Sequence, residues 1–369
     1  MLGATDGPNP VHPPGYPLWI ALGVAGKVLL KWDPYTSFKL AATLASIAEP
    51  ILFVPLAARW IGARAAWWLA LLLGCSPLYW FHSVTALTYT AGSAFATAVA
   101  FLCDSALKSP APRGADRRLL AAALLCGIGT GVRPDLPLWV GPLLLWCARS
   151  ATPVGRVRAI SLMLILIGGW AVLIRFGLYG SGVDSSGALA HTGRMLLATS
   201  VFQLGLWDGL LRNGVKTAAY LVWTLGMAAL VAPWLWWTAA RDLCRHRRDD
   251  AMFLLIWLLP ALLFNLLIHM TEPGHAIWHL APLWLLLGVG VASKWPRRAT
   301  AVLCGGVICA TAQFWFYPWR PNPAAPFAKR LIDAKVGYMS RTGLRQIDRR
   351  DEIHQPGDFW RTRAHDLPD

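Results

Sequence analysis

The sequence predicts an all-α polytopic membrane protein with about ten transmembrane helices. Hydrophobic residues make up 56% of its 369 residues and charged residues only 14%, whereas a soluble domain carries about 25% charged residues. The charges are also unevenly distributed, because 17 of them lie in residues 318–369. The preceding part of the chain is therefore too apolar for a soluble globule or a disordered segment.

The net charge of +15 would suggest a nucleic-acid partner in a soluble protein. Here the basic residues form short clusters between apolar runs, which is typical of membrane topology and not of a nucleic-acid-binding patch. We therefore expect no nucleic acid among the partners. The seven cysteines form no CxxC pair and most lie within apolar runs, which favours small buried side chains over disulfides or a metal site.

The order of the apolar runs divides the chain into three parts. Residues 1–36 form a Pro-rich outer loop, in which the short apolar run 17–32 predicts a helix lying at the membrane interface. Residues 37–317 form the transmembrane domain, and residues 318–369 form a polar outer tail with one short amphipathic helix. The predicted spans are 37–58, 65–81, 87–107, 118–132, 135–149, 157–178, 215–240, 251–270, 276–293 and 298–317.

Lys and Arg residues in the short loops predict the orientation of the chain. The connections 82–86 and 271–275 have none, and all the basic loops fall on the other side of the predicted spans, so that side is cytoplasmic. Both termini are then outside, and we infer that a first span, which would carry the N-terminus across the membrane, is absent. The basic loops are 59–64, 108–118, 149–158, 241–248 and 294–298.

The other polar sequence lies on the predicted outer side, where ionisable groups at the membrane edge are functional candidates. The segment HPPGYPLW contains His12 and Tyr16, and its prolines and glycine predict a rigid backbone at the start of the interfacial helix. A plain Pro-rich helix entry is the alternative. Asp6 is the only acid before His12 and a candidate general base, although its Gly-Pro neighbours suit a turn equally well.

Arg133, Pro134 and Asp135 join the short spans 118–132 and 135–149, which predicts a V-shaped helix pair with its apex below the outer surface. Arg133 and Arg194 are candidates to bind a phosphate group, because a guanidinium donates two N–H groups to phosphate oxygens. A structural ion pair between Arg133 and Asp135 is an equal alternative, since a buried charge needs a partner. The polar loop 180–213 is either a lid over the site or a simple connector.

A second cluster consists of His269, Glu272, His275 and His279. His275 and His279 are one turn apart at the start of a predicted helix and would share a face. The spacing is not H-E-x-x-H, so a zinc protease is excluded. Three interpretations stay open: contacts to a phosphate donor or an acceptor, a divalent metal held by His275 and His279, and capping of the helix at the interface.

These segments resemble, in order and spacing over about residues 10–295, those of polyprenyl-linked integral-membrane glycosyltransferases of the C-type (GT-C) fold. HPPGYPLW resembles the first outer loop of that family, GVRPDLP its G-x-R-P-D turn, and HMTEPGHAIWHLAP its turn before a late span. The family includes protein O-mannosyltransferase-like and lipid A aminoarabinose transferase-like proteins. The resemblance implies a GT-C-like fold that here lacks the first span.

The resemblance also implies a hexosyltransferase in the cytoplasmic (inner) membrane whose active face lies outside. A carboxylate in the first outer loop would act as general base on the hydroxyl of a lipid, glycan or protein acceptor. That hydroxyl attacks C1 of a sugar on polyprenyl phosphate, and the lipid phosphate leaves. In the family this carboxylate lies further upstream than Asp6, so either it is missing here or the protein is inactive. The residues implied to contact donor or acceptor are His12, Tyr16, Arg133, Asp135, Arg194, His269, Glu272, His275 and His279.

Two other classes compete with a glycosyltransferase. A transporter or lipid flippase would show repeated halves with broken helices and charges in mid-span, but the sequence has no such repeat and few such acids, chiefly Glu49 and Asp104. A truncated or degenerate, non-catalytic paralogue is the third possibility, because the expected upstream carboxylate has no clear counterpart. No cofactor is expected, apart from a possible divalent metal.

Overall fold

The computed structural model describes residues 16–32, 34–83, 87–174, 197–270 and 273–316. Within these ranges the regular structure is entirely helical, which confirms the predicted all-α class. The N-terminal segment 1–15 and the tail 318–369 lie outside the described residues, so the expectations for them stay predictions.

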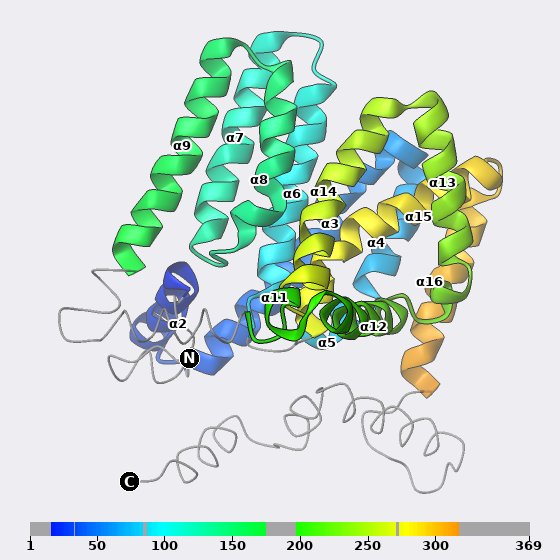
Figure 1. Cartoon of the computed structure of the whole chain (residues 1–369), viewed down its shortest axis with the longest axis horizontal. Coiled ribbons are helices and arrows are strands. Elements are labelled where there is room, and N and C mark those ends of the chain that lie inside the picture. Colours follow the sequence, from blue (N-terminus) through cyan, green and yellow to red (C-terminus); the bar gives the residue numbers. More distant parts are fainter. Residues whose placement is uncertain (1–15, 33, 84–86, 175–196, 271–272, 317–369) are drawn as a thin grey trace, which may run out of the picture.

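The long helices stand side by side in two groups (Figure 1). The first group is α6 (Tyr89–Leu107), α7 (Pro112–Thr130), α8 (Leu136–Cys147) and α9 (Pro153–Val172). The second is α3 (Pro34–Ile61), α4 (Ala63–Gly74), α13 (Ala232–His246), α15 (Leu280–Lys294) and α16 (Ala299–Phe316). Helix α14 (Arg248–Leu267) contacts α8 of the first group and α13 of the second, so it joins the two.

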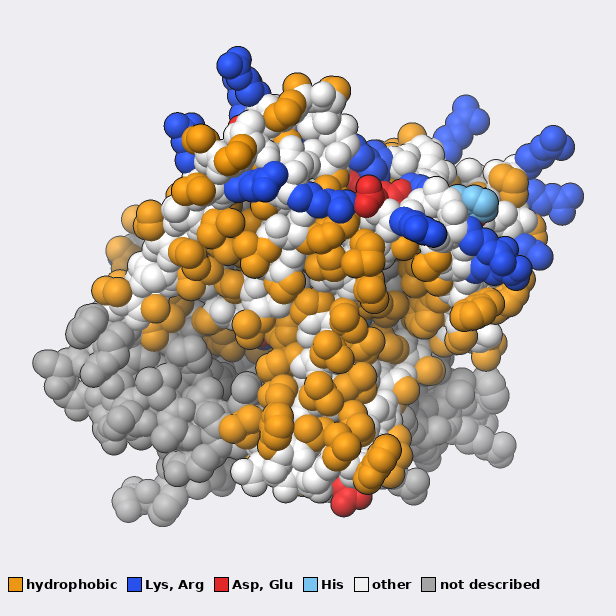
Figure 2. All heavy atoms as spheres, turned by 45° about the horizontal axis from the view of Figure 1, so that its top comes forward, with side chains coloured by type: hydrophobic (Ala, Val, Ile, Leu, Met, Phe, Trp, Pro, Cys, Tyr) orange, Lys and Arg blue, Asp and Glu red, His pale blue; other side chains and the backbone are white. Residues whose placement is uncertain are grey.

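The basic turns between these helices meet at one end of the bundle, hereafter the basic end. Figure 2 shows Lys and Arg side chains gathered along this end, above a broad apolar surface. Ion pairs and hydrogen bonds join the turns to one another across the sequence. They connect Arg59 with Asp104, Lys108 with Asp250, Arg149 with Asp249, and Ser293 with Asp242.

The other end of the bundle carries short elements that lie across the long helices, and it is hereafter the polar end. Helix α2 (Pro17–Leu30) lies where the sequence predicts an interfacial helix. The Leu18 N–H donates to the Gly131 carbonyl at 2.8 Å, and the Trp19 ring stacks on Phe38 with centroids 5.6 Å apart. Several apolar residues of α2 stay exposed, among them Leu29 and Leu30. This arrangement suits a helix with one face on the protein and one face in the membrane interface.

The predicted span 215–240 is wrong as a single helix. The structure divides it into α12 (Leu206–Leu225), the 3₁₀ turn η3 (Gly226–Leu230) and α13. Gly226 has φ +53°, a left-handed conformation that glycine adopts without steric cost and that ends a helix. Pro233 then lies in the first turn of α13, where a missing N–H is tolerated. Helix α12 lies across the polar end (Figure 1), and only α13 runs with the bundle.

Two other predicted spans begin or end differently. The span 65–81 is divided into α4 and the short helix α5 (Pro77–Ser83), because Pro77 cannot continue α4. The span 276–293 begins with the 3₁₀ helix η4 (Pro273–His279). Within the described residues, five helical segments are long and apolar enough to cross a membrane: Thr36–Ile61, Tyr89–Leu107, Pro153–Val172, Arg248–Leu267 and Gly274–Lys294. The total of about ten spans therefore stays a prediction.

A buried carboxyl group joins α3 of the second group to α6 of the first group and to the short helix α5. Glu49, on α3, is fully buried and accepts hydrogen bonds from the Tyr79, Ser93 and Thr97 hydroxyls at 2.8, 2.8 and 2.9 Å. These donors come from α5 and α6. In a bilayer no water replaces a lost partner, so we infer that this network fixes α3 against α5 and α6.

We predict that Glu49→Leu lowers the free energy of unfolding by about 2 kcal/mol, because it removes the acceptor shared by three buried hydroxyls and leaves Tyr79 only the Ser46 carbonyl at 3.2 Å. The Ser93 and Thr97 hydroxyls can turn to carbonyls of their own helix, which limits the loss. Glu49→Gln retains an acceptor oxygen and should lose less. Thermal unfolding in detergent measures the effect, with Ile47→Ala as the control, since Ile47 lies on the same helix and is 56% exposed. Equal losses in the Leu and Gln variants would contradict the hydrogen-bond account.

Candidate functional site

The tight turn between α7 and α8 positions the first two candidate residues. Helix α7 ends at Thr130, and the Arg133 N–H donates to the Gly129 carbonyl at 2.8 Å. Pro134 supplies no N–H and disfavours helical backbone before it, so the chain turns at Arg133. Helix α8 then begins directly after Asp135. The turn thus places an Arg and an Asp at the polar end of the bundle, as the sequence predicts.

Arg133 forms a two-point ion pair with Asp135. Its Nε donates to Oδ1 at 2.9 Å and its Nη2 to Oδ2 at 2.6 Å, while Nη1 donates to the Thr88 hydroxyl at 3.2 Å. The Arg133 side chain is only 6% exposed, whereas that of Asp135 is 27% exposed. Burial alone would raise the pKa of the Asp135 carboxyl, but the charge and hydrogen bonds of Arg133 hold that pKa below its usual range. Both groups are therefore charged at neutral pH.

Aromatic rings surround the Arg133 guanidinium. Its central carbon lies 4.7 Å from the ring centroid of Tyr89, 5.5 Å from that of Trp278 and 5.9 Å from that of Tyr16. These distances allow cation–π attraction, which is stronger where the cation is out of water. The rings come from α6, η4 and the residue before α2. Arg133 therefore lies where three segments distant in sequence meet.

Glycine makes this close approach possible. A Cβ on Gly92 would lie 2.6 Å from the Trp278 ring and 2.9 Å from the Arg133 side chain, and a Cβ on Gly274 would collide with the Tyr89 ring. Any larger residue at these two positions would push η4 or the Arg133 side chain away from α6. The Gly274 part of the turn motif is thus explained by packing against Tyr89.

The histidines of the second cluster separate into two environments. His275 packs edge-on against Tyr89, with ring centroids 5.6 Å apart, and against His269, with centroids 5.3 Å apart. His269 in turn lies 3.4 Å from the Thr199 hydroxyl. His279 is fully buried, and its Nε2 lies 2.8 Å from the Asn265 side-chain nitrogen. His275 therefore faces the Arg133 side, and His279 belongs to the packed interior.

The expectation that His275 and His279 share one helical face is wrong. Both belong to the 3₁₀ helix η4, and the α-helix begins only at Leu280. Side chains three residues apart eclipse each other in a 3₁₀ helix, so residues four apart point in different directions. Within the part of the chain that the structure describes, no group of three His, Cys, Asp or Glu side chains is arranged to hold a metal ion.

The structure brings together five of the predicted site residues: Tyr16, Arg133, Asp135, His269 and His275. Four others lie outside the described residues, namely Asp6, His12, Arg194 and Glu272. Sequence reasoning missed Thr88, Tyr89 and Trp278, which contact Arg133 directly. Each lies at or near an end of an apolar run, and the enrichment of Tyr and Trp at the membrane interface is the only signal that points to the two aromatics.

Comparison with known proteins bears on the fold. Residues 9–152 match the family model of the protein O-mannosyl-transferase TMEM260 N-terminal domain. The solved structure of ArnT from Cupriavidus metallidurans bound to undecaprenyl phosphate superposes with a TM-score of 0.56 at 19% identity, covering 83% of this chain and 56% of that chain. ArnT from the same organism in the apo state gives a TM-score of 0.52 at 21% identity, covering 80% and 52%.

This chain thus spans about half the length of the ArnT structures that it matches. The search of curated proteins found no match. The family model covers HPPGYPLW and the Arg133 turn. The chain therefore shares the fold of these ArnT structures over most of its length.

Proposed function

We propose that this chain is a membrane glycosyltransferase that moves a sugar from polyprenyl phosphate to an acceptor hydroxyl. The supporting observation is the enclosed cation Arg133, held by Asp135 and Thr88 at the polar end of an ArnT-like fold. The ArnT of Cupriavidus metallidurans was solved with undecaprenyl phosphate bound, and a lipid phosphate is the kind of group that a fixed guanidinium binds. Sugar and acceptor stay undefined, with a lipid, a glycan and a protein as acceptor classes.

The proposed chemistry divides the roles among these residues. Asp135 and Thr88 use three of the five N–H groups of the Arg133 guanidinium. The remaining N–H groups would bind an oxygen of the lipid phosphate, which is the leaving group of the reaction. His275 and His269 line the neighbouring surface and would contact the sugar or acceptor. A carboxylate must accept the proton of the attacking hydroxyl, and Asp6 is the candidate within this chain. His12, Arg194 and Glu272 keep their proposed contacts to donor or acceptor.

The charge distribution favours an outer-facing site. Lys and Arg side chains gather at the basic end (Figure 2). Helices α7 and α8 run between this end and the turn that carries Arg133. Short basic loops stay in the cytoplasm. We therefore place the site at the outer face of the cytoplasmic membrane.

Transport and flipping find less support among the described residues. A transporter uses mid-membrane ionisable groups to bind its cargo or coupling ion. Here Glu49 is bonded to three hydroxyl groups, and Asp104 is paired with Arg59 and Lys108. Both acids thus have protein partners that hold helices together. A non-catalytic paralogue would keep the Arg133 environment but would not transfer sugar. An assay of sugar transfer therefore distinguishes it from an active enzyme.

We predict that Arg133→Lys weakens binding of undecaprenyl phosphate by about 30-fold, the loss expected for one charged hydrogen bond of about 2 kcal/mol. Lysine keeps the positive charge but lacks the planar fork that pairs with Asp135 and a phosphate at once. Binding is measured on the purified chain by native mass spectrometry, together with the thermal midpoint of unfolding.

The control for this variant is Arg118→Lys. Arg118 donates to the Ser105 carbonyl at 2.7 Å at the basic end, so its replacement should leave binding unchanged. An Arg133→Lys protein that is less stable yet binds undecaprenyl phosphate like the wild type would show that the Arg133–Asp135 pair is only structural.

A second prediction concerns orientation. Cys244 and Arg113 are exposed at the basic end, which we place in the cytoplasm. An impermeant maleimide added to intact cells should therefore modify neither Cys244 nor a cysteine introduced by Arg113→Cys. The same reagent should modify both in inverted membrane vesicles. Modification of either position from outside would place the basic end outside the cytoplasm and overturn the proposed orientation.

A further inference from the structure

A second polar feature lies at the basic end, far from Arg133. The turn between α13 and α14 forms a hollow of about 580 Å³, hereafter the basic hollow. It is lined by Arg245, His246, Arg247, Arg248, Asp249 and Asp250. None of these residues takes part in the site proposed above, so the basic hollow needs its own explanation.

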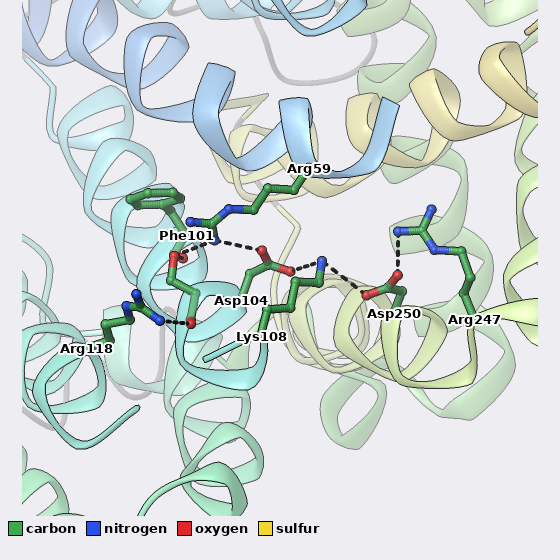
Figure 3. A network of polar contacts seen from close by, with 8 residues as sticks. Arg59, Phe101, Asp104, Lys108, Arg118, Arg247 and Asp250 are labelled. Carbon is green, nitrogen blue, oxygen red and sulfur yellow. Dashed lines mark hydrogen bonds and ion pairs between the residues drawn. The ribbon is translucent and has the colours of Figure 1, made fainter. Parts of the chain in front are cut away.

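The two acids of the basic hollow are already paired with cations. Asp250 forms ion pairs with Arg247 at 2.5 Å and with Lys108 at 3.4 Å, as Figure 3 shows. Lys108 also contacts Asp104 at 2.7 Å, and Asp104 contacts Arg59 at 3.0 Å. This chain of charges joins α14 to α6 and α3.

Asp249 is paired separately, with Arg149 at 2.6 Å. Three cations therefore engage the two acids: Arg149 from the turn after α8, Lys108 from the residue after α6, and Arg247 from the residue before α14. These pairs leave the two acids with little capacity to neutralise further positive charge.

Two arginines at the rim have no such partner. Arg245 and Arg248 are exposed, and neither forms an ion pair with any residue that the structure describes. His246, which follows Arg245 in the chain, is exposed as well. The basic hollow therefore offers two guanidinium groups without an ion-pair partner above acids that are already paired, which favours an anion.

The helices below the rim indicate which anion. On α13, Arg245 lies eight residues after Trp237 and on the same helical face, and Trp237 is 70% exposed. On α14, Met252 and Leu255 follow Arg248 at four and seven residues, on one face, and are 42% and 48% exposed. Each helix thus presents a cation at the membrane edge and uncovered apolar side chains beneath it.

We propose that the basic hollow binds the phosphate of an anionic glycerophospholipid, whose acyl chains lie along the exposed faces of α13 and α14. A free inorganic anion would use the two arginines but would gain nothing from the apolar stripes. Basic pockets between helices on the cytoplasmic side bind acidic headgroups, with each nearby cation contributing to affinity. This proposal concerns the end of the bundle opposite Arg133 and does not depend on the transferase activity.

The test titrates the purified full chain with phosphatidylglycerol and, separately, with phosphatidylcholine, and follows binding by native mass spectrometry. We expect selective binding of phosphatidylglycerol, weakened about 10- to 30-fold in Arg245→Gln/Arg248→Gln, which removes two cations near the headgroup. The matched control is Arg113→Gln/Arg117→Gln. It removes two exposed arginines from another turn of the same end and should change binding less than about threefold.

Three results would overturn the proposal. Equal loss in both double variants would show attraction to the basic surface as a whole, without a site. Unchanged binding in Arg245→Gln/Arg248→Gln would remove the basic hollow from consideration. Displacement of phosphatidylglycerol by millimolar inorganic phosphate would assign the hollow to a soluble anion. Thermal midpoints of both variants, which lose no ion pair, separate these outcomes from unfolding.

Discussion

A charged side chain inside a bilayer has no water to bind, and this constraint shapes the described part of the molecule. In this part of the molecule, each ionic group either lies at an end of the bundle or is bonded to another group of the protein. Asp104 is 1% exposed and is paired with two cations, and Glu49 is held by three hydroxyl groups. The apolar middle of the molecule is thus left to packing, and chemistry is confined to the ends.

The two ends use charge in opposite ways. At the basic end, the ion pairs of Asp249 and Asp250 join helix ends at partly exposed positions, where each pair contributes little to stability, and arginines remain in excess at the rim. At the polar end a single buried pair, Arg133 with Asp135, is enclosed by aromatic rings. Breaking such a buried pair costs about 3–5 kcal/mol, so the second arrangement demands fixed geometry, whereas the first tolerates adjustment.

The sequence predicted the turn that carries Arg133 and Asp135, but it did not predict how the helices around this turn are divided. Arg133 and Asp135 stand out because charges between two apolar runs are rare and the adjacent proline requires a turn. Tyr89 and Trp278 were not predicted, because the sequence of an apolar run does not indicate which distant residue an aromatic side chain will contact. The division at Gly226 was missed because the second half of α12, η3 and the first part of α13 form one apolar run in the sequence, which predicted a single span over 215–240. Hydrophobic periodicity also does not distinguish the short 3₁₀ helix η4 from the first turns of an α-helix.

The position of Arg133 in the bundle connects its environment with the packing of the whole fold. Arg133 comes from the turn between α7 and α8, Tyr89 from the start of α6, and Trp278 and His275 from η4, which leads into α15 of the second group. The contact of η4 with α6 depends on the absence of a side chain at Gly92 and Gly274. The ring-lined cation therefore forms only where the two helix groups meet, and any shift of one group against the other would open the guanidinium to its surroundings. Because Arg133 is buried where the two helix groups meet, the exposure of its guanidinium depends on how the two groups pack against each other.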